Sequence, residues 1–392
     1  MTFLLSTAAA SVEAQGLFRG QSGSICTQAE EAGIEPIRRT LVYVDRQSLS
    51  LDPADLGWFG ALNQMLQQTM TTAEPLEMVI LDSVEGTAKA HGESLCYPVI
   101  EERYHERFVS SGISSFLTND LLDQIPELQK EFVVQMQNLI APGYVDAPAN
   151  IAKRSVERIE SRHLLRALQS DAARFSSDLP TRVILYSDMI ENSDLVDLTA
   201  VLSSSPEERV AMADTALASL PRLDFQGAMV YGYGTGATLD NPSAVEALSG
   251  FMQQVIYLAN GYPVALSREL AVQPIRPSVV TSYDMNIEVE ERQIKGRMQL
   301  MSDNGGRIID SYLDLGTGNR SSHLDSGRLV CSQDAQCQFE GELATALLFE
   351  DPEKLFLEGE RDALTGHLGF RNDRLVDSDN PALLPLDAQA RP

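Results

Sequence analysis

The chain has 392 residues, of which 43% are hydrophobic, so it is long and apolar enough for two packed domains. Its 56 acidic and 30 basic residues give a net charge of −26, which repels phosphate backbones and argues against nucleic-acid binding. The acidic residues are spread along the whole sequence, a pattern typical of a solvated acidic surface.

The first fourteen residues resemble a secretory signal peptide. Phe3 to Val12 is largely apolar, and Val12-Glu-Ala14 has the small-x-small pattern of a cleavage site, although no basic residue precedes the apolar run. The alternative is a frayed apolar extension. No other stretch approaches the ~20 apolar residues of a membrane span. We therefore expect an exported protein, periplasmic or extracellular, with no transmembrane segment and with residues 15–39 as an N-terminal extension.

The four cysteines support export. Cys331 and Cys337 bracket a short polar loop between two strand-like runs, which suits a local disulfide. Cys26 and Cys96 then remain as a second pair, which would staple the region before the first strand to the region after the second. The sequence has no Cys-x-x-Cys, which argues against a zinc knuckle or a thioredoxin-type motif. Buried free thiols are the alternative.

Two apolar runs, residues 40–45 and 182–188, end on Asp45 and Asp188. Short apolar runs followed by helical patterns predict buried parallel strands of an α/β sheet. Carboxylates at the ends of such strands lie at the edge where open α/β folds bind ligands. Further strands are expected at residues 76–81, 225–233 and 264–266. Helices are expected at residues 56–70, 117–140 with a kink or a restart at Pro126, 149–175, 205–220 and 243–260.

The Pro content of Gln273-Pro-Ile-Arg-Pro277 predicts a linker, and the sequence pattern changes after it. From residue 276 to residue 370, short runs alternate apolar and polar residues and are separated by turn signals such as Asp303-Asn-Gly-Gly306. We expect a smaller all-β domain there, a sandwich or a barrel. Residues 371–392 are polar and contain prolines, which favours a disordered tail.

The succession of elements over residues 40–268 resembles a von Willebrand factor A-like domain, which has a doubly wound, mostly parallel sheet. In that family a metal-ion-dependent adhesion site takes Asp-x-Ser-x-Ser after the first strand, a Thr before a helix, and an Asp after the fourth strand. Carboxylate and hydroxyl oxygens bind Mg²⁺, and one coordination position stays open for a partner's carboxylate. The resemblance thus implies an α/β fold, Mg²⁺ as the cofactor, and a protein ligand.

When the family motif is compared with this sequence, Asp45 matches the first Asp of the motif and Asp188 matches the last. Ser161 stands where the family has its Thr, before a helix with Ala-Leu a few residues on. Ser155 lies nearby and competes with it for that place.

The loop after Asp45 departs from the motif, because Gln47 and Leu49 stand where two hydroxyls belong. A one-residue insertion would bring Ser48 and Ser50 into those places. The loop also resembles an Asp-Arg-Thr form of exported bacterial family members, with Gln47 in place of the Thr.

The resemblance therefore implies Asp45, Ser48, Ser50, Ser161 and Asp188 as metal ligands. The alternative is that the two aspartates only cap the helices that follow their strands.

Other chemistry-bearing motifs are weak. The five histidines are scattered without metal-ligand spacing, and no Gly-x-Ser-x-Gly or P-loop sequence occurs. Gly232-Tyr-Gly234-Thr-Gly236 lacks the dinucleotide-binding spacing, and we expect a flexible loop at the same edge as Asp45 and Asp188.

We therefore expect a non-enzymatic, exported protein-binding protein, an adhesion molecule or scaffold, with no catalytic residues. Its ligand face would lie around Asp45, Ser161, Asp188 and the Gly232–Gly236 loop, with Mg²⁺ as candidate cofactor and an acidic side chain of the ligand as its partner. One alternative is a metal-dependent hydrolase that uses Asp45 and Asp188 to activate water. Another is a metal-free structural subunit of an envelope or particle assembly.

Overall fold

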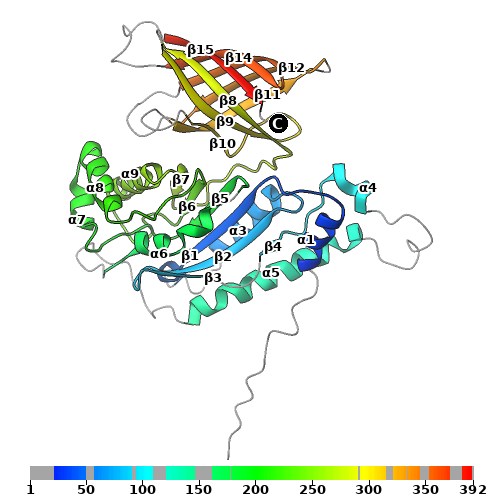
Figure 1. The fold of residues 1–392 in the computed structure, drawn as a ribbon. Coiled ribbons are helices and arrows are strands. Elements are labelled where there is room, and N and C mark those ends of the chain that lie inside the picture. Colours follow the sequence, from blue (N-terminus) through cyan, green and yellow to red (C-terminus); the bar gives the residue numbers. More distant parts are fainter. Residues whose placement is uncertain are drawn as a thin grey trace, which may run out of the picture.

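The protein folds into a mixed α/β part and a closed antiparallel β-barrel, which lies at the top in Figure 1. This computed structural model describes residues 22–49, 57–90, 94–108, 121–145, 161–176, 178–289, 292–314, 321–332, 334–344, 353–370 and 382–390. The expected combination of an α/β sheet and a smaller all-β part is confirmed, and the all-β part is a barrel.

The sheet has seven strands, most of them parallel, in the order β3-β2-β1-β5-β6-β7, with β4 paired to β2. The parallel strands are β1 (Arg39–Asp45), β2 (Pro75–Asp82), β5 (Thr181–Tyr186), β6 (Met229–Tyr233) and β7 (Tyr262–Ser267). The short strands β3 (Thr87–Ala90) and β4 (Leu95–Cys96) run antiparallel to β2. Because β1 lies between β2 and β5, the carboxyl ends of these three strands meet at one edge.

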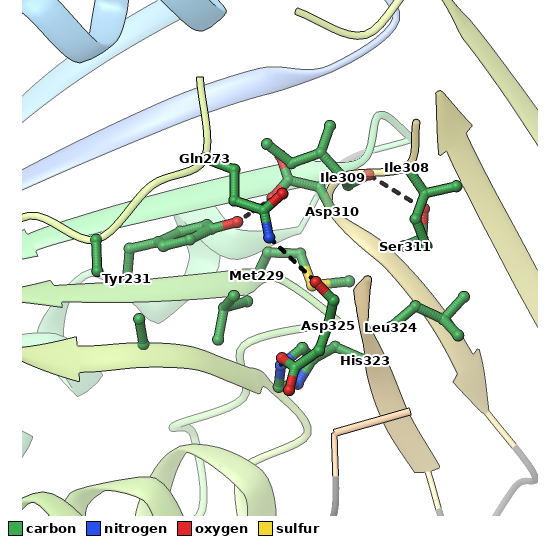
Figure 2. Close-up of a pocket in the computed structure, with 13 residues that line it drawn as sticks. Met229, Tyr231, Gln273, Ile308, Ile309, Asp310, Ser311, His323, Leu324 and Asp325 are labelled. Carbon is green, nitrogen blue, oxygen red and sulfur yellow. Dashed lines mark hydrogen bonds and ion pairs between the residues drawn. The ribbon is translucent and has the colours of Figure 1, made fainter. Parts of the chain in front are cut away.

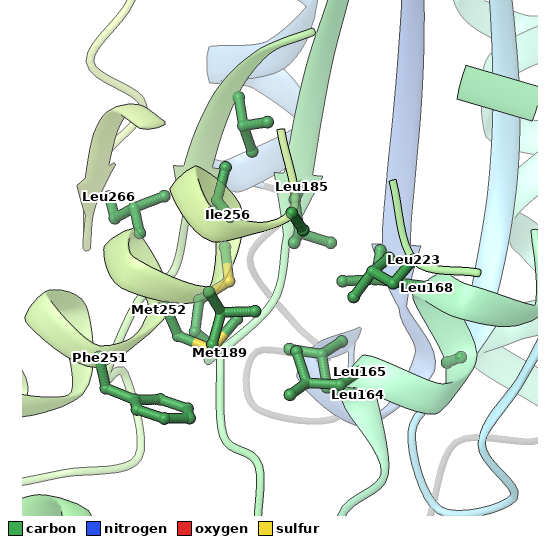
Figure 3. Packing of buried hydrophobic residues seen from close by; sticks show 14 of the residues in the cluster. Leu164, Leu165, Leu168, Leu185, Met189, Leu223, Phe251, Met252, Ile256 and Leu266 are labelled. Atoms are coloured by element: carbon green, nitrogen blue, oxygen red, sulfur yellow. The ribbon is translucent and has the colours of Figure 1, made fainter. Parts of the chain in front are cut away.

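Helices cover both faces of the sheet. On one face, α3 (Gly57–Thr69) and α5 (Leu121–Val145) pack their apolar residues against β1, β2 and β5. On the other face lie α6 (Leu164–Ser170), α7 (Leu198–Ser203), α8 (Pro206–Ala218) and α9 (Pro242–Leu258). Figure 3 shows this second core, where side chains of α6 and α9 gather around Leu185 of β5. The shorter helices are α1 (Ser22–Glu31), α2 (Arg46–Leu49), η1 (Glu102–Tyr104), α4 (His105–Phe108) and η4 (Ala172–Phe175).

Two helices differ from the expectation. Within the described part of residues 149–175, the expected helix is represented by α6 and η4, and residues 149–160 lie outside the described ranges. Helix α5 continues through Pro126 and on to Val145. Its buried residues Phe132, Met136 and Ile140 anchor it to the sheet, and this packing outweighs the ladder hydrogen bond that Pro126 cannot donate.

The barrel closes in the strand order β10-β11-β12-β13-β14-β15-β8-β9. Its strands are β8 (Val279–Val289), β9 (Arg292–Ser302), β10 (Ser311–Asp314), β11 (Ser321–Cys331), β12 (Gln336–Leu343), β13 (Glu353–Glu360), β14 (Ala363–Phe370) and β15 (Ala382–Ala390). A cluster of buried apolar side chains fills it, including Tyr283, Leu300, Phe339 and Leu357. Eight strands leave room for such a packed interior.

Strand β15 corrects the expectation of a disordered tail for residues 382–390, whereas residues 371–381 lie outside the described ranges. Residues 382–390 pair with β14 on one side and β8 on the other, so they close the ring. Because the barrel is closed, β15 has a hydrogen-bonded neighbour on each side. This pairing stabilises a strand that its own sequence predicts poorly. Pro385 and Asp387 hide its strand pattern, since both residues are depleted in strands.

Both expected disulfides are present, and all four cysteines are paired. Cys26–Cys96 joins α1 to β4, and Cys331–Cys337 joins neighbouring positions of β11 and β12. Among the described residues we find no helix with the length and hydropathy that a membrane span requires.

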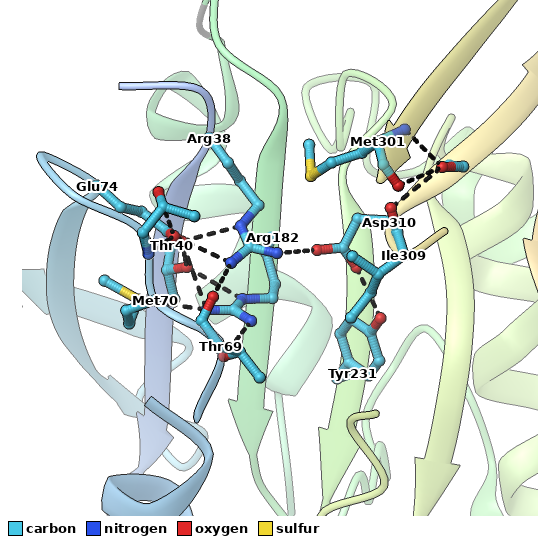
Figure 4. Close-up of polar contacts among 12 residues, drawn as sticks. Arg38, Thr40, Thr69, Met70, Glu74, Arg182, Tyr231, Met301, Ile309 and Asp310 are labelled. Atoms are coloured by element: carbon cyan, nitrogen blue, oxygen red, sulfur yellow. Dashed lines mark hydrogen bonds and ion pairs between the residues drawn. The ribbon is translucent and has the colours of Figure 1, made fainter. Parts of the chain in front are cut away.

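A buried ionic network fixes the barrel to the sheet (Figure 4). Arg38, just before β1, pairs with Glu74 at 2.9 Å and with Asp310 of the barrel at 2.5 Å. Tyr231 of β6 donates a hydrogen bond to the same Asp310 at 2.7 Å, and Arg182 of β5 pairs with Glu74 at 3.4 Å. Since Arg38, Glu74 and Arg182 lie at the amino ends of β1, β2 and β5, this contact is at the opposite end from Asp45 and Asp188.

Candidate functional site

The cluster at the carboxyl edge is built around Asp45, the last residue of β1. Its Oδ1 accepts hydrogen bonds from the Ser83 hydroxyl at 2.9 Å and from the Gln47 N–H at 3.2 Å. Its Oδ2 accepts from the Ser187 hydroxyl at 3.1 Å and lies 3.1 Å from the Ser83 hydroxyl. Ser83 follows β2 and Ser187 follows β5, so the two strands that flank β1 each supply a hydroxyl to this carboxylate.

Asp188 is held on the other side of the same cluster. Its N–H donates to the Ser48 hydroxyl at 2.9 Å, so α2 and the turn after β5 are joined directly. Its Oδ1 accepts from the Ile190 N–H at 3.2 Å, and its Oδ2 accepts from the Thr238 hydroxyl at 3.2 Å. Asp45 and Asp188 are each 1% exposed, and the hydrogen bonds named above reach their carboxylates from hydroxyls and backbone N–H groups.

The glycine-rich loop lies at this edge, next to the turn that carries Asp188. The Gly236 N–H donates to the Asp188 carbonyl at 2.9 Å. Gly234 has a φ of +91°, and a Cβ at this position would lie 3.1 Å from the Ser187 carbonyl oxygen. A side chain there is therefore strained in conformation and crowded, which explains the glycine.

Two carboxyl groups near this edge have raised pKa values. The pKa of Asp45 is raised to about 6, mainly by burial and secondly by the negative charge of Asp188. The positive charge of Arg162 and the hydrogen bonds from Gln47 and Ser83 lower this pKa, but by less. Burial raises the pKa of Glu191 to about 7. Glu191 accepts hydrogen bonds from the Leu165 N–H at 2.8 Å, in the first turn of α6, and from the Ser193 hydroxyl at 2.5 Å.

The structure brings together three of the five residues that the resemblance implied as metal ligands. Asp45, Ser48 and Asp188 share the cluster, whereas Ser50 lies outside the described residues. Ser161 is exposed, and its hydroxyl contacts His163 Nε2 at 3.0 Å and the Asn192 carbonyl at 3.3 Å, with no described contact to either carboxylate. A metal-binding role for these residues remains a prediction.

Sequence reasoning missed Ser83, Ser187 and Thr238 as members of the cluster. A signal existed for the first two, since each directly follows a strand that is parallel to β1 and adjacent to it. Thr238 had no such signal, because the fold of the glycine-rich loop positions it. Asp45 caps α2, since it accepts from the Gln47 N–H in the first turn of that helix, and it also accepts from the hydroxyls of Ser83 and Ser187. Asp188 instead bonds within a turn, since the next described helix, α7, begins only at Leu198.

The donor set consists of oxygen atoms: two carboxylates with the hydroxyls of Ser48, Ser83, Ser187 and Thr238 around them. Carboxylate and hydroxyl oxygens suit a hard cation such as Mg²⁺ better than a soft one. Within the described ranges, no three His, Cys, Asp or Glu side chains are grouped so as to hold a metal ion, so a bound cation would need these hydroxyls or water as further ligands. Two adjacent buried carboxylates and an oxygen-rich shell therefore fit Mg²⁺.

A small cavity lies between β6, β7 and the barrel (Figure 2). Its volume is about 130 Å³, and Tyr231, Asp310, Gln273 and His323 are among its lining residues. His323 Nε2 lies 2.7 Å from Asp325 Oδ1, and Asp310 is already bound by Arg38 and Tyr231. The volume is below the ~300 Å³ of ordinary ligand pockets, and its polar groups are already paired, so we interpret it as a packing gap between the two parts.

No family model matches the chain, and a search of curated proteins finds no match either. The functional argument therefore depends on the geometry of the carboxyl edge.

Proposed function

We propose that the chain is an exported protein-binding protein, an adhesion molecule or scaffold, whose residues 40–268 form a von Willebrand factor A-like domain. The described succession of elements supports this: a strand ending on Asp45, a helix, a strand, further helices, and a strand followed by Ser187-Asp188. Two more parallel strands with helices between them complete the sheet. The two disulfides support export, because such bonds persist in oxidising compartments outside the cytosol.

The observation that carries the proposal is the convergence of Asp45 and Asp188 in one buried, oxygen-rich cluster. Two buried carboxylates side by side are unfavourable unless a proton or a cation neutralises them. The raised pKa of Asp45 reflects the unfavourable free energy of a buried negative charge beside a second one. A divalent cation would remove the cost, and Asp45, Ser48 and Asp188 are the residues that would hold it.

The surrounding side chains orient these ligands. Ser83 and Ser187 fix the Asp45 carboxylate from two sides, and Thr238 fixes that of Asp188. When bound, Mg²⁺ supplies a positive charge and a coordination position for an acidic side chain of a protein ligand. Because both carboxylates are buried, that side chain has to enter between the loops that follow β1, β5 and β6.

Calorimetric titration of the full chain with Mg²⁺ and with Mn²⁺ tests the proposal. We expect binding at one site, and at least about a tenfold loss of affinity, or about 1.4 kcal/mol, in Asp188→Asn. Asp194→Asn is the matched control, because Asp194 lies nearby, is exposed and pairs with Arg166, so the variant removes the same charge away from the cluster. An absence of heat at millimolar metal in the unsubstituted chain would contradict the Mg²⁺-dependent form of the proposal.

A further inference from the structure

Arg268 directly follows β7 and binds the end of the glycine-rich loop. Its Nη2 donates to the Leu239 carbonyl at 2.5 Å and to the Gly236 carbonyl at 3.2 Å. The Leu239 N–H donates to the same Gly236 carbonyl at 3.0 Å, so residues 236–239 form a turn with Thr238 inside it. Arg268 is exposed, whereas Thr238 and Leu239 are buried. One nitrogen atom of a surface side chain thus joins both ends of a buried turn.

The backbone of β7 holds the start of the same loop. The Ser267 carbonyl accepts hydrogen bonds from the N–H groups of Gly234 at 3.0 Å and of Thr235 at 3.1 Å. Gly234 and Gly236 have φ values of +91° and +63°, which glycine adopts at little cost among many other conformations. A loop with this freedom needs contacts from outside to keep one conformation, and the end of β7 supplies them.

The turn that Arg268 binds also orients Asp188. The Thr238 hydroxyl donates to Asp188 Oδ2 at 3.2 Å, and the Gly236 N–H donates to the Asp188 carbonyl at 2.9 Å. The two carbonyls that accept from Arg268 stand on either side of Thr238 in the chain. A continuous series of hydrogen bonds therefore leads from the guanidinium, through the turn, to the Asp188 carboxylate.

We propose that Arg268 is a positioning residue of the cluster: it fixes the turn of residues 236–239, so that the Thr238 hydroxyl holds the Asp188 carboxylate in the orientation for binding a cation. The part of this inference that concerns the cation rests on the proposed function. Removal of a group that orients a metal ligand commonly weakens metal binding. The segment after β7 thereby belongs to the ligand face, together with the loops after β1, β5 and β6.

Three variants separate positioning from charge. Arg268→Met keeps an unbranched apolar stem and removes both the donor and the charge. Arg268→Lys keeps one charged nitrogen, which can donate to both carbonyls as Nη2 does. Arg209→Met is the matched control, because Arg209 of α8 also donates to a backbone carbonyl, that of Ser204 at 2.8 Å.

Hydrogen exchange of the metal-free full chain is the first test. In Arg268→Met we expect exchange to be at least about threefold faster in residues 234–239 and also in residues 187–190, where the Ile190 N–H bonds to Asp188 Oδ1. Exchange in β12 should stay unchanged, which separates this effect from a general loss of stability. Arg268→Lys should restore most of the protection, and Arg209→Met should leave both segments as they are. Faster exchange confined to residues 234–239, or none, would overturn the proposal.

Mn²⁺ calorimetry on the same chains is the second test. Arg268→Met is expected to bind Mn²⁺ about tenfold more weakly than the unsubstituted chain, and Arg268→Lys within about threefold of it. The direction is diagnostic, because removal of a positive charge by itself would strengthen cation binding. Unchanged or tighter binding in Arg268→Met would overturn the part that concerns the cation. If the unsubstituted chain does not bind Mn²⁺, the proposed metal site fails, and the exchange test alone decides whether Arg268 positions Asp188.

Discussion

Ser187 joins the ends of the two central strands, since its hydroxyl donates to Asp45 Oδ2 at 3.1 Å. The Ser187 N–H donates to the Tyr233 carbonyl at 2.9 Å, and its hydroxyl oxygen accepts from the Met189 N–H at 3.0 Å. The hydroxyl is thus held in one position by β6 and by the turn that carries Asp188. This relationship makes the carboxyl edge a preorganised cluster, because the residue before one aspartate orients the other.

Ser187→Ala is therefore expected to weaken the fold as well as the site. It removes one donor from a buried carboxylate, and we expect a loss of about 1–3 kcal/mol in the free energy of unfolding. Urea denaturation measures this loss. Ser203→Ala, which removes an exposed hydroxyl of α7, is the control and should have a much smaller effect. Equal losses in the two variants would mean that Ser187 does not support Asp45.

The stability of the protein should depend on the ionisation of Glu191. Its pKa is about 4.5 in the unfolded chain and about 7 in the fold, so the folded protein binds the proton more tightly. The stabilisation is complete below about pH 4.5 and is lost as the pH rises through 7. We expect about 2–3 kcal/mol less stability from this group at pH 8 than at pH 5.

Glu191→Gln separates this effect from the other carboxylates. The amide oxygen can still accept from the Leu165 N–H, and the ionisation is gone. Denaturation at pH 5 and pH 8 should show a smaller difference in this variant than in the unsubstituted chain, with Glu191→Gln the more stable at pH 8. The same pH difference in both chains would show that Glu191 does not ionise in this range.

The network between sheet and barrel should be a major source of stability. Asp310→Asn removes the charge that faces Arg38 and disturbs the acceptor of Tyr231, leaving excess positive charge buried. We expect a loss of about 3–5 kcal/mol, measured by urea denaturation. Glu127→Gln breaks an exposed pair with Lys130 and serves as control, with little change expected. If Asp310→Asn were as stable as this control, the network would not hold the barrel to the sheet.

The two disulfides should contribute unequally to the free energy of unfolding. Cys26 and Cys96 are 70 residues apart, whereas Cys331 and Cys337 are 6 apart. In the chain-entropy description, removal of the first bond costs about 4 kcal/mol and removal of the second about 2 kcal/mol. Denaturation of the two double Cys→Ala variants compares them, and a larger loss for the Cys331–Cys337 pair would contradict this ranking.

The sequence contained enough to predict the strands that end on Asp45 and Asp188 and their meeting at one edge, because parallel strands align their carboxyl ends. It also contained both disulfide pairs. Arg162, Ser83 and Thr238 could not be placed in the same way. Their positions depend on strand order and loop contacts, such as the bridge between Arg162 and Asn192, which local patterns do not encode.

The barrel shows a second limit of sequence patterns. Alternating strands predict a sandwich and a barrel equally well, and the distinction depends on β15 pairing with β8. That pairing joins residues about one hundred positions apart in the sequence, and Pro385 obscures one of the two strands.

Anomalous diffraction from crystals of the full chain grown with Mn²⁺ tests the central claim most directly. The account predicts a peak between the carboxylates of Asp45 and Asp188 and the Ser48 hydroxyl, with ligand oxygens at about 2.0–2.6 Å. No peak at this edge, with Asp45 still bound by Ser83 and Ser187 as described, would contradict the claim that the cluster is a cation site.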